Sequence, residues 1–458
     1  MMRPLSLFLL LCAEAASATP ADAPTVAQAT PSSVTPSAAS TAEPTAAPAQ
    51  PSRTLSLEEA LQTATSHQPQ LRQAQANTQA AEARVDQRRS SLLPQVNSTL
   101  TYQRSTSGTT GTSTPTTGIS VRNNGFTLGA TASQLLYDFG QTTGRWRAAQ
   151  SSAEAQASTG EQTRLDVLAN VRTAYFNVLA QQALLQVARE TLANEESHLN
   201  QVQAQVEVGT RPEIDLLQQK TSLSNARLQL IQSQNAYATS KAQLNQAMGV
   251  KGSTDYAVQD VTVAPVEGED QPTDALVTSA LSRRPDLAAS ASELRAQQQQ
   301  LSATRGGYWP SLSASLSGSD VGEDPSQTQW NLTGQLALSW PLFQGGLTRA
   351  QVREQEATLS SLQAQRDSLQ QQARLQVESA QLSVRAARES LSAAEDALAN
   401  ARERLRLAEG RYQAGVGNII ELGDAQVQAT NAAAQRVQAV YQIATARTEL
   451  ARALGLVS

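Results

Sequence analysis

The chain has 458 residues, of which 4% are aromatic, and its formal net charge is −5. So few aromatic side chains fill a thick core poorly and favour helices packed through small residues. The acidic balance excludes a general nucleic-acid-binding surface, so no nucleic acid is expected among the partners. The length permits two or three ordinary domains, but an internal repeat favours one elongated unit built twice.

Residues 1–18 have the pattern of a signal peptide. Arg3 supplies a positive charge, residues 5–12 form a short apolar stretch, and Ala16-Ser17-Ala18 is a cleavage site of the small-residue type. An ordinary N-terminal helix is the alternative. Cys12 is the only cysteine and would be removed with the peptide, so the mature chain would have neither a disulfide nor a cysteine metal site.

The rest of the chain repeats itself. Gly140, Gly209 and Gly249 return 206 residues later, and Pro69 and Pro94 return 216 residues later. Such a tandem duplication is hard to obtain by chance. A disordered Ala/Pro/Thr/Ser-rich linker is predicted over 19–53, and a second linker over 251–271. The first repeat covers 54–250 and contains a β-hairpin at 95–137 and a long helical hairpin at 141–248. The second repeat covers 272–458 and contains a β-hairpin at 311–340 and a long helical hairpin at 347–454.

In each repeat the glycines delimit a predicted helix of about 65–70 residues, which is about 100 Å long at ~1.5 Å rise per residue. The helix that follows Pro69 and the returning helix together nearly match this length, so we expect them to stack end to end along it. The fold class predicted is all-α, with long antiparallel coiled-coil hairpins in tandem. In the first long helix, apolar residues step by three and four as a coiled-coil seam requires, at Leu165, Leu168, Val171, Tyr175 and Leu179.

Each repeat also contains two predicted strands of about ten residues with one apolar and one small-polar face. Trp330 and Trp340 are about 25 Å apart in height on a tilted strand, which is the usual separation of the aromatic girdles of a membrane barrel. Soluble β-hairpins that pack through their apolar faces are the alternative. The predicted girdle consists of Tyr102, Phe126, Tyr308, Trp309, Trp330 and Trp340.

Four strands from one chain cannot close a barrel, which needs about eight. Open sheet edges do not occur in lipid, so a barrel in the outer membrane would have to be shared between chains. Two chains would give about eight strands and a filled lumen, whereas three would give about twelve and leave room for a channel. A duct therefore favours a homotrimer surrounded by outer-membrane lipid.

Several duplicated motifs then carry a resemblance to the TolC family of outer-membrane export channels, over residues 55–455. They are Ala60-Leu61 with Pro69 and Ala275-Leu276 with Pro285, Leu93-Pro94 and Trp309-Pro310, Pro341-Leu342-Phe343-Gln344-Gly345-Gly346, and the tip glycines Gly209 and Gly415. The resemblance implies a homotrimer with a twelve-stranded transmembrane β-barrel, to which each chain gives four strands, and an α-helical periplasmic tunnel. It also implies docking to a periplasmic adaptor (membrane fusion) protein and an inner-membrane transporter.

No catalytic constellation is present in the sequence, so we expect neither an enzyme nor a cofactor. His67 and His198 are the only histidines, and neither has candidate metal ligands at a suitable spacing. Both are expected to be solvated or packed in the coiled coil.

The two helical tips hold the candidate functional residues. Glu421 and Asp424 lie three residues apart, so they share one helical face. Repeated around an axis they would form carboxylate rings that favour cations; charges solvated near a helix start are the alternative reading.

The TolC-like pattern implies further roles at these tips. Glu421 and Asp424 correspond to the acidic pair at the periplasmic constriction, and Tyr412 corresponds to a gate tyrosine whose acidic partner is Asp215. A latch arginine is expected just after the second tip glycine, but Gly417 stands there, so Arg211 is the substitute candidate. The residues expected to dock the adaptor are Gly209, Thr210, Gly415 and Val416.

These observations predict an outer-membrane exit duct of a tripartite efflux or type I secretion system. The alternative from another class is a soluble, secreted coiled-coil tether or scaffold without a pore. The strands would lie in the outer membrane and the helices in the periplasm.

Overall fold

The computed structural model of the chain describes residues 53–107, 121–252, 254–261, 264–322 and 328–456. All of them fall in one compact unit, Ser52–Ser458. The signal peptide predicted over 1–18 and the linker predicted from 19 up to residue 52 lie outside the described residues.

Two helices of 67 residues each dominate the described chain, α3 (Gln141–Glu207) and α7 (Leu347–Gln413). Each begins after a glycine with positive φ, Gly140 (85°) and Gly346 (86°), and the chain leaves each through another, Gly209 (75°) and Gly415 (77°). Only glycine adopts this left-handed backbone at little cost, which is why the repeated glycines mark the helix ends. None of the described helices combines the length and the apolar character needed to cross a membrane.

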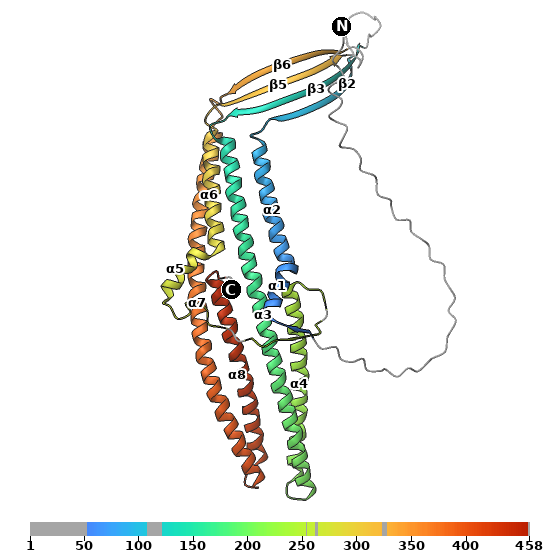
Figure 1. Ribbon diagram of the computed structural model, residues 1–458, viewed down its shortest axis with the longest axis vertical. Helices are drawn as coiled ribbons and strands as arrows, with labels where there is room; N and C mark the ends of the chain where they lie inside the picture. The colour runs from blue at the N-terminus through green and yellow to red at the C-terminus, as the bar shows by residue number, and fades with distance from the viewer. Residues whose placement is uncertain (1–52, 108–120, 253, 262–263, 323–327, 457–458) are drawn as a thin grey trace, which may run out of the picture. The chain divides into compact units, whose positions relative to one another are not determined.

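Shorter helices pack along the two long ones. Figure 1 shows α2 and α4 one after the other beside α3, and α6 and α8 one after the other beside α7. Both α6 and α8 also contact α3, so they join the two long helices. The bounds are α1 Leu57–His67, α2 Pro69–Ser90, α4 Glu213–Met248, α5 Thr273–Arg283, α6 Pro285–Gly306 and α8 Ile419–Ala453.

The predicted coiled-coil seam of α3 is buried. Leu165, Leu168, Val171, Tyr175 and Leu179 all have less than a tenth of their surface exposed, and Val171 and Tyr175 have none. The expectation of a helical seam is thereby confirmed. The capping box predicted at the start of α1 is also present, because Ser56 and Glu59 each accept the other's backbone N–H.

The stacked helices meet at two equivalent joints. At the first, Gln68 Nε2 donates to the carbonyl of Ala247 at 2.8 Å, near the end of α4. At the second, the buried Arg284 donates through Nη1 to the carbonyl of Ala453 at 3.4 Å, at the end of α8. Each of these side chains stands just before the proline that starts α2 or α6, so it satisfies a carbonyl that a helix end leaves without an intrahelical partner.

Equivalent positions on the long helices also hold the connecting segments. The hydroxyl of Tyr175 on α3 donates to the carbonyls of Leu55 at 3.1 Å and Gln259 at 2.7 Å, beside the parallel strands β1 (Arg53–Leu55) and β4 (Tyr256–Val258). Burial raises the pKa of Tyr175 to about 12, so the hydroxyl keeps the proton that it donates. Gln381 lies 206 residues later on α7, and its Nε2 donates to the carbonyl of Gln271 at 2.8 Å.

The four remaining strands form one antiparallel sheet in the order β2-β3-β5-β6. The hairpins of the two halves are joined by the pairing of β3 with β5, and β2 and β6 are left as the two edges. Their bounds are β2 Gln95–Ser107, β3 Val121–Tyr137, β5 Ser311–Gly322 and β6 Thr328–Ser339.

The sheet separates apolar from polar residues. One face carries large apolar side chains that are more than half exposed, including Val96 (73%) and Leu336 (71%). The other is lined by small polar residues, as in the row formed by Asn97, Thr131, Ser317 and Thr333. An exposed apolar face of this kind indicates a surface that meets lipid or another chain.

The strands are longer than the ten residues expected from the sequence. They have 13, 17, 12 and 12 residues in β2, β3, β5 and β6. The loops predicted over 105–124 and 318–329 are therefore shorter than expected. The prediction followed the apolar alternation, whereas ladder hydrogen bonds need only the backbone, so polar residues such as 105–107 also pair.

Replacing Tyr175 by phenylalanine tests the fastening of the connecting segments. Tyr175→Phe leaves the carbonyls of Leu55 and Gln259 without this donor, which we expect to cost about 1–3 kcal/mol of stability. Thermal unfolding of the purified protein followed by circular dichroism would show a lower midpoint. The matched control is Tyr102→Phe, at a side chain that is 64% exposed. Equal midpoints for the two variants would contradict the assignment.

Candidate gate at the helical tips

Both hairpin tips are tight turns that expose the predicted docking residues. In the first, Thr210 closes the end of α3 by donating its N–H and its hydroxyl to the carbonyl of Gln205, both at 2.9 Å. In the second, the N–H of Val416 donates to the carbonyl of Arg411 at 3.1 Å. Gly209, Thr210, Gly415 and Val416 are all exposed, and the turn geometry holds them at the surface.

Arg211 joins the two tips. Its Nη2 donates to the carbonyl of Tyr412 at 2.7 Å, and its Nη1 donates to the carbonyl of Gly417 at 3.5 Å. The guanidinium also lies 4.1 Å from the centroid of the Tyr412 ring, which is within the range of a cation–π contact. One side chain of the first hairpin therefore holds the backbone and the aromatic ring of the second.

Asp215 completes this group. Tyr412 and Asp215 are both buried, at 5% and 6% exposure. Burial raises the pKa of the Tyr412 hydroxyl, the charge of Asp215 raises it further, and Arg211 lowers it. Within the described residues the hydroxyl has no well-formed hydrogen bond. We refer to Arg211, Tyr412, Asp215 and Gly417 as the tip cluster.

The backbone explains why Gly417 stands where the resemblance predicts an arginine. A Cβ atom at this position would lie 2.7 Å from the N atom of Tyr412 and 2.9 Å from the carbonyl carbon of Arg411. The turn therefore admits no side chain here, and Gly417 contributes its carbonyl to Arg211 instead.

Glu421 and Asp424 lie outside the tip cluster. Both are exposed in the first two turns of α8, and the Oε1 of Glu421 lies 3.5 Å from the Nε of Arg411.

The predicted girdle residues lie near the two ends of the sheet. At the helical end, Trp340 Nε1 donates to the carbonyl of Tyr308 at 3.3 Å, and Trp309 stacks on Phe139, which the sequence analysis omitted, with 5.3 Å between ring centroids. Toward the other end, Tyr102 pairs in register with Phe126, and Trp330, 81% exposed, lies at a similar level on the opposite edge strand, β6.

Polar contacts that the sequence did not reveal link α3 to α4 and to α7 on the strand side of the tip cluster. Glu195 on α3 is 6% exposed and accepts a hydrogen bond from Gln219 Nε2 at 2.6 Å. One turn further, His198 Nε2 lies 3.5 Å from Glu409 Oε1 on α7. Glu195 and His198 on α3 are three residues apart, as are members of the apolar seam, and this spacing is the sequence signal that could have revealed them.

Glu195 borders a cavity of about 510 Å³ between α3, α4 and α8. Burial raises the pKa of Glu195, while the hydrogen bond from Gln219 and the nearby His198 lower it. Among the described residues, no three His, Cys, Asp or Glu side chains are grouped closely enough to hold a metal ion.

Gly417→Ala should loosen the second tip. The added methyl group has no space beside the Arg411–Tyr412 peptide, so we expect a cost of about 1–3 kcal/mol and faster trypsin cleavage after Arg411. Gly423→Ala is the control, because a Cβ atom there meets nothing within 4 Å in the interior of α8. Unchanged cleavage of the Gly417 variant would show that the close approach does not constrain the tip.

Glu195→Gln should alter how stability depends on pH. Because the folded-state pKa of Glu195 is raised, the folded chain holds this proton more tightly than the unfolded chain. The wild type therefore loses stability relative to the variant as the pH rises from the ordinary glutamate pKa through the raised one. Unfolding midpoints compared across this range measure the difference, with the exposed Glu196→Gln as control. A difference that stays constant with pH would contradict the assignment.

A family model described as outer membrane efflux protein matches residues 60–250 and 276–456, which is most of the chain. The probable efflux pump outer membrane protein SepC of Pseudomonas putida is 30% identical over 264 residues, covering 56% of this chain and 52% of SepC. The chain thus spans about half the length of that relative. Protein CyaE of Bordetella pertussis is 28% identical over 409 residues, covering 88% of this chain and 84% of CyaE.

Solved structures share the fold. The Campylobacter jejuni CmeC outer membrane channel has a TM-score of 0.76 at 20% identity, covering 87% of this chain and 85% of CmeC. The Vibrio cholerae outer membrane protein VceC has a TM-score of 0.76 at 19% identity, covering 87% and 96%. The predicted fold class is confirmed. The chain therefore belongs to the outer membrane efflux protein family and is a protein of the outer membrane, as its resemblance to the TolC family predicts.

Proposed function

We propose that this protein is the outer-membrane exit duct of a tripartite efflux system. It passes small molecules from a periplasmic adaptor and an inner-membrane transporter to the outside of the cell. The observation that carries the proposal is the four-stranded sheet, which has an exposed apolar face and two edges that no other described strand pairs with. Three copies would supply about twelve strands, close all edges and leave a polar lumen.

The signal peptide and the two repeats each have a role in the proposed duct. Residues 1–18 act as the signal peptide and direct export, and the repeats at 54–250 and 272–458 each give two strands to the barrel and one long hairpin to the tunnel. The exposed tips at Gly209 and Gly415 dock the adaptor. The name of SepC refers to an efflux pump and that of a second relative to toluene efflux, which favours small molecules over proteins as the cargo.

The tip cluster acts as the gate latch in this proposal. Arg211 holds the two hairpins of one chain together, and the duct opens when the hairpins separate. Because the contacts of Arg211 are two hydrogen bonds to backbone carbonyls and one ring contact, a partner that draws the tips apart has few interactions to break.

Planar-bilayer conductance tests the duct and the latch separately. Wild-type protein should form channels of low conductance, and Arg211→Ala should raise the mean conductance about threefold to tenfold if the latch contributes about 1 kcal/mol. Arg227→Ala is the control, since Arg227 is exposed and only approaches Glu196 at 3.7 Å. No channels from any variant would refute the duct. Equal conductance of the wild type and Arg211→Ala would refute the latch alone.

The exposed carboxylates give a second test of the gate. The double variant Glu421→Ala with Asp424→Ala should weaken block of the channel by divalent cations, because it removes the acidic ring of the trimer. Glu213→Ala, at an exposed acid of the first tip, is the matched control. If the double variant is blocked as strongly as the wild type, these residues do not line the constriction.

A further inference from the structure

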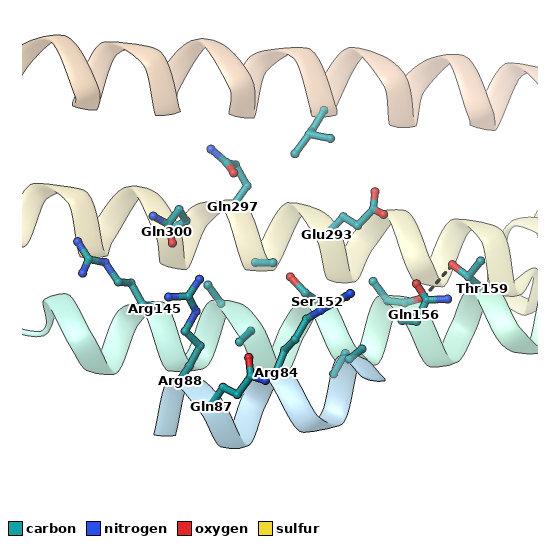
Figure 2. A pocket seen from close by; sticks show the side chains of 17 residues that line it. Arg84, Gln87, Arg88, Arg145, Ser152, Gln156, Thr159, Glu293, Gln297 and Gln300 are labelled. Carbon is teal, nitrogen blue, oxygen red and sulfur yellow. Dashed lines mark hydrogen bonds between the residues drawn. The ribbon is translucent and has the colours of Figure 1, made fainter. Parts of the chain in front are cut away.

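A groove between α2, α3 and α6 gathers positive charge that the proposed duct does not use. Its volume is about 990 Å³. Figure 2 shows Arg84 and Arg88 reaching from α2 across the face of α3, with Arg84 directed toward Ser152 and Arg145 rising from α3 nearer to Arg88. Among the described residues that line the groove, Glu293 is the one acidic side chain, and it lies further along on α6.

These three arginines lack carboxylate partners within the described part of the chain. Other arginines of the same region do have carboxylate partners: Arg295 pairs with Glu154 at 3.0 Å, and Arg305 pairs with Glu356 at 2.8 Å. Arg84 and Arg88 are also four residues apart on one helix, where like charges repel each other. Although the chain has a net charge of −5, this groove is thus lined by three cations that have no paired carboxylate among the described residues.

The groove is shaped for an anion with an organic part. Its floor consists of small α3 residues such as Ala148, Ala149 and Ser152, and Gln87 and Gln300 add amide groups at its sides. Guanidinium groups bind phosphate oxygens through paired hydrogen bonds. The volume is at the upper end of the range for small-molecule sites, so it exceeds what one inorganic ion would fill.

The position of the arginines indicates where such a ligand comes from. Arg145 lies in the second turn of α3, and Arg88 lies in the last turn of α2, so each is within about 10 Å of the strand ends along its helix. Trp309 (56% exposed) and Phe139 (43%) stand at that junction. Exposed aromatic residues of this kind mark the membrane–water boundary of a barrel, and basic pockets beside it bind anionic lipid head groups.

We propose that Arg88 and Arg145 bind the phosphate of an anionic phospholipid at the periplasmic surface of the outer membrane, and that Arg84, further along the groove, adds to its positive charge. This inference rests on the proposed function, because it requires the sheet to lie in that membrane. The lipid would tie α2 to α3 at the base of the barrel, and its phosphate would offset part of the positive charge of the arginines.

Binding of a short-chain phosphatidylglycerol to the purified full-length protein in neutral detergent tests the site, with native mass spectrometry as readout. Substituting Arg84→Gln, Arg88→Gln and Arg145→Gln together should weaken binding about a hundredfold, at ~1 kcal/mol for each arginine near a membrane surface. The matched control substitutes the exposed Arg366, Arg402 and Arg404 of α7 by glutamine and should bind as the wild type does.

Two further ligands distinguish the sources of the anion. Phosphatidylcholine should bind weakly to all variants, and inorganic phosphate should not displace phosphatidylglycerol at equal concentration. Displacement by inorganic phosphate would overturn the lipid as the ligand, and equal binding by the wild type and the triple variant would overturn the site. The triple variant should still conduct in planar bilayers. A wild type that conducts but binds phosphatidylglycerol no better than phosphatidylcholine would refute only this inference. A wild type that forms no channels would refute the duct.

Discussion

The unpaired edges of the four-stranded sheet are the constraint on which the rest of the structure depends. The outer edges of β2 and β6 pair with no other described strand of the chain, and the apolar face beside them is exposed. A membrane offers no water to satisfy the backbone N–H and C=O groups of such edges, so an outer-membrane protein of this fold must pair its edges with other copies. The polar face then surrounds a lumen, and the helices that leave the strands surround its continuation.

Each half of the duplicated chain supplies the same set of elements, two strands and one long helical hairpin. The long helices α3 and α7 have equal lengths, and residues 206 positions apart, Tyr175 and Gln381, fasten the connecting segments to them. The halves differ at their tips, where Arg211 of the first hairpin reaches the turn of the second. This difference allows one hairpin to hold the other, so the asymmetry between the repeats supplies the contact that we assign to the gate.

Much of this fold could be predicted because its signals are local. The repeated glycines fixed the ends of the long helices, since positive φ favours glycine, and apolar spacing revealed the seam around Val171 and Tyr175. The pairing of β3 with β5 and the true strand lengths could not be predicted, because backbone ladders between distant segments leave no pattern in polar residues. At the tips, the resemblance pointed to Tyr412 and Asp215, but only the geometry explains Gly417, and the buried Glu195 appeared as an ordinary helical polar residue.

Cross-linking between the edge strands tests the central claim most directly. A cysteine at Thr99 on β2 would be combined in turn with one at Asn331, Thr333 or Gln335 on β6, all on the polar face of the sheet. Oxidation of the protein in native membranes should give, for at least one pair, a covalent ladder that ends at three chains, because β2 of one copy lies beside β6 of the next. Uncross-linked chains for all pairs, or a ladder that ends at two chains, would contradict a barrel shared by three copies.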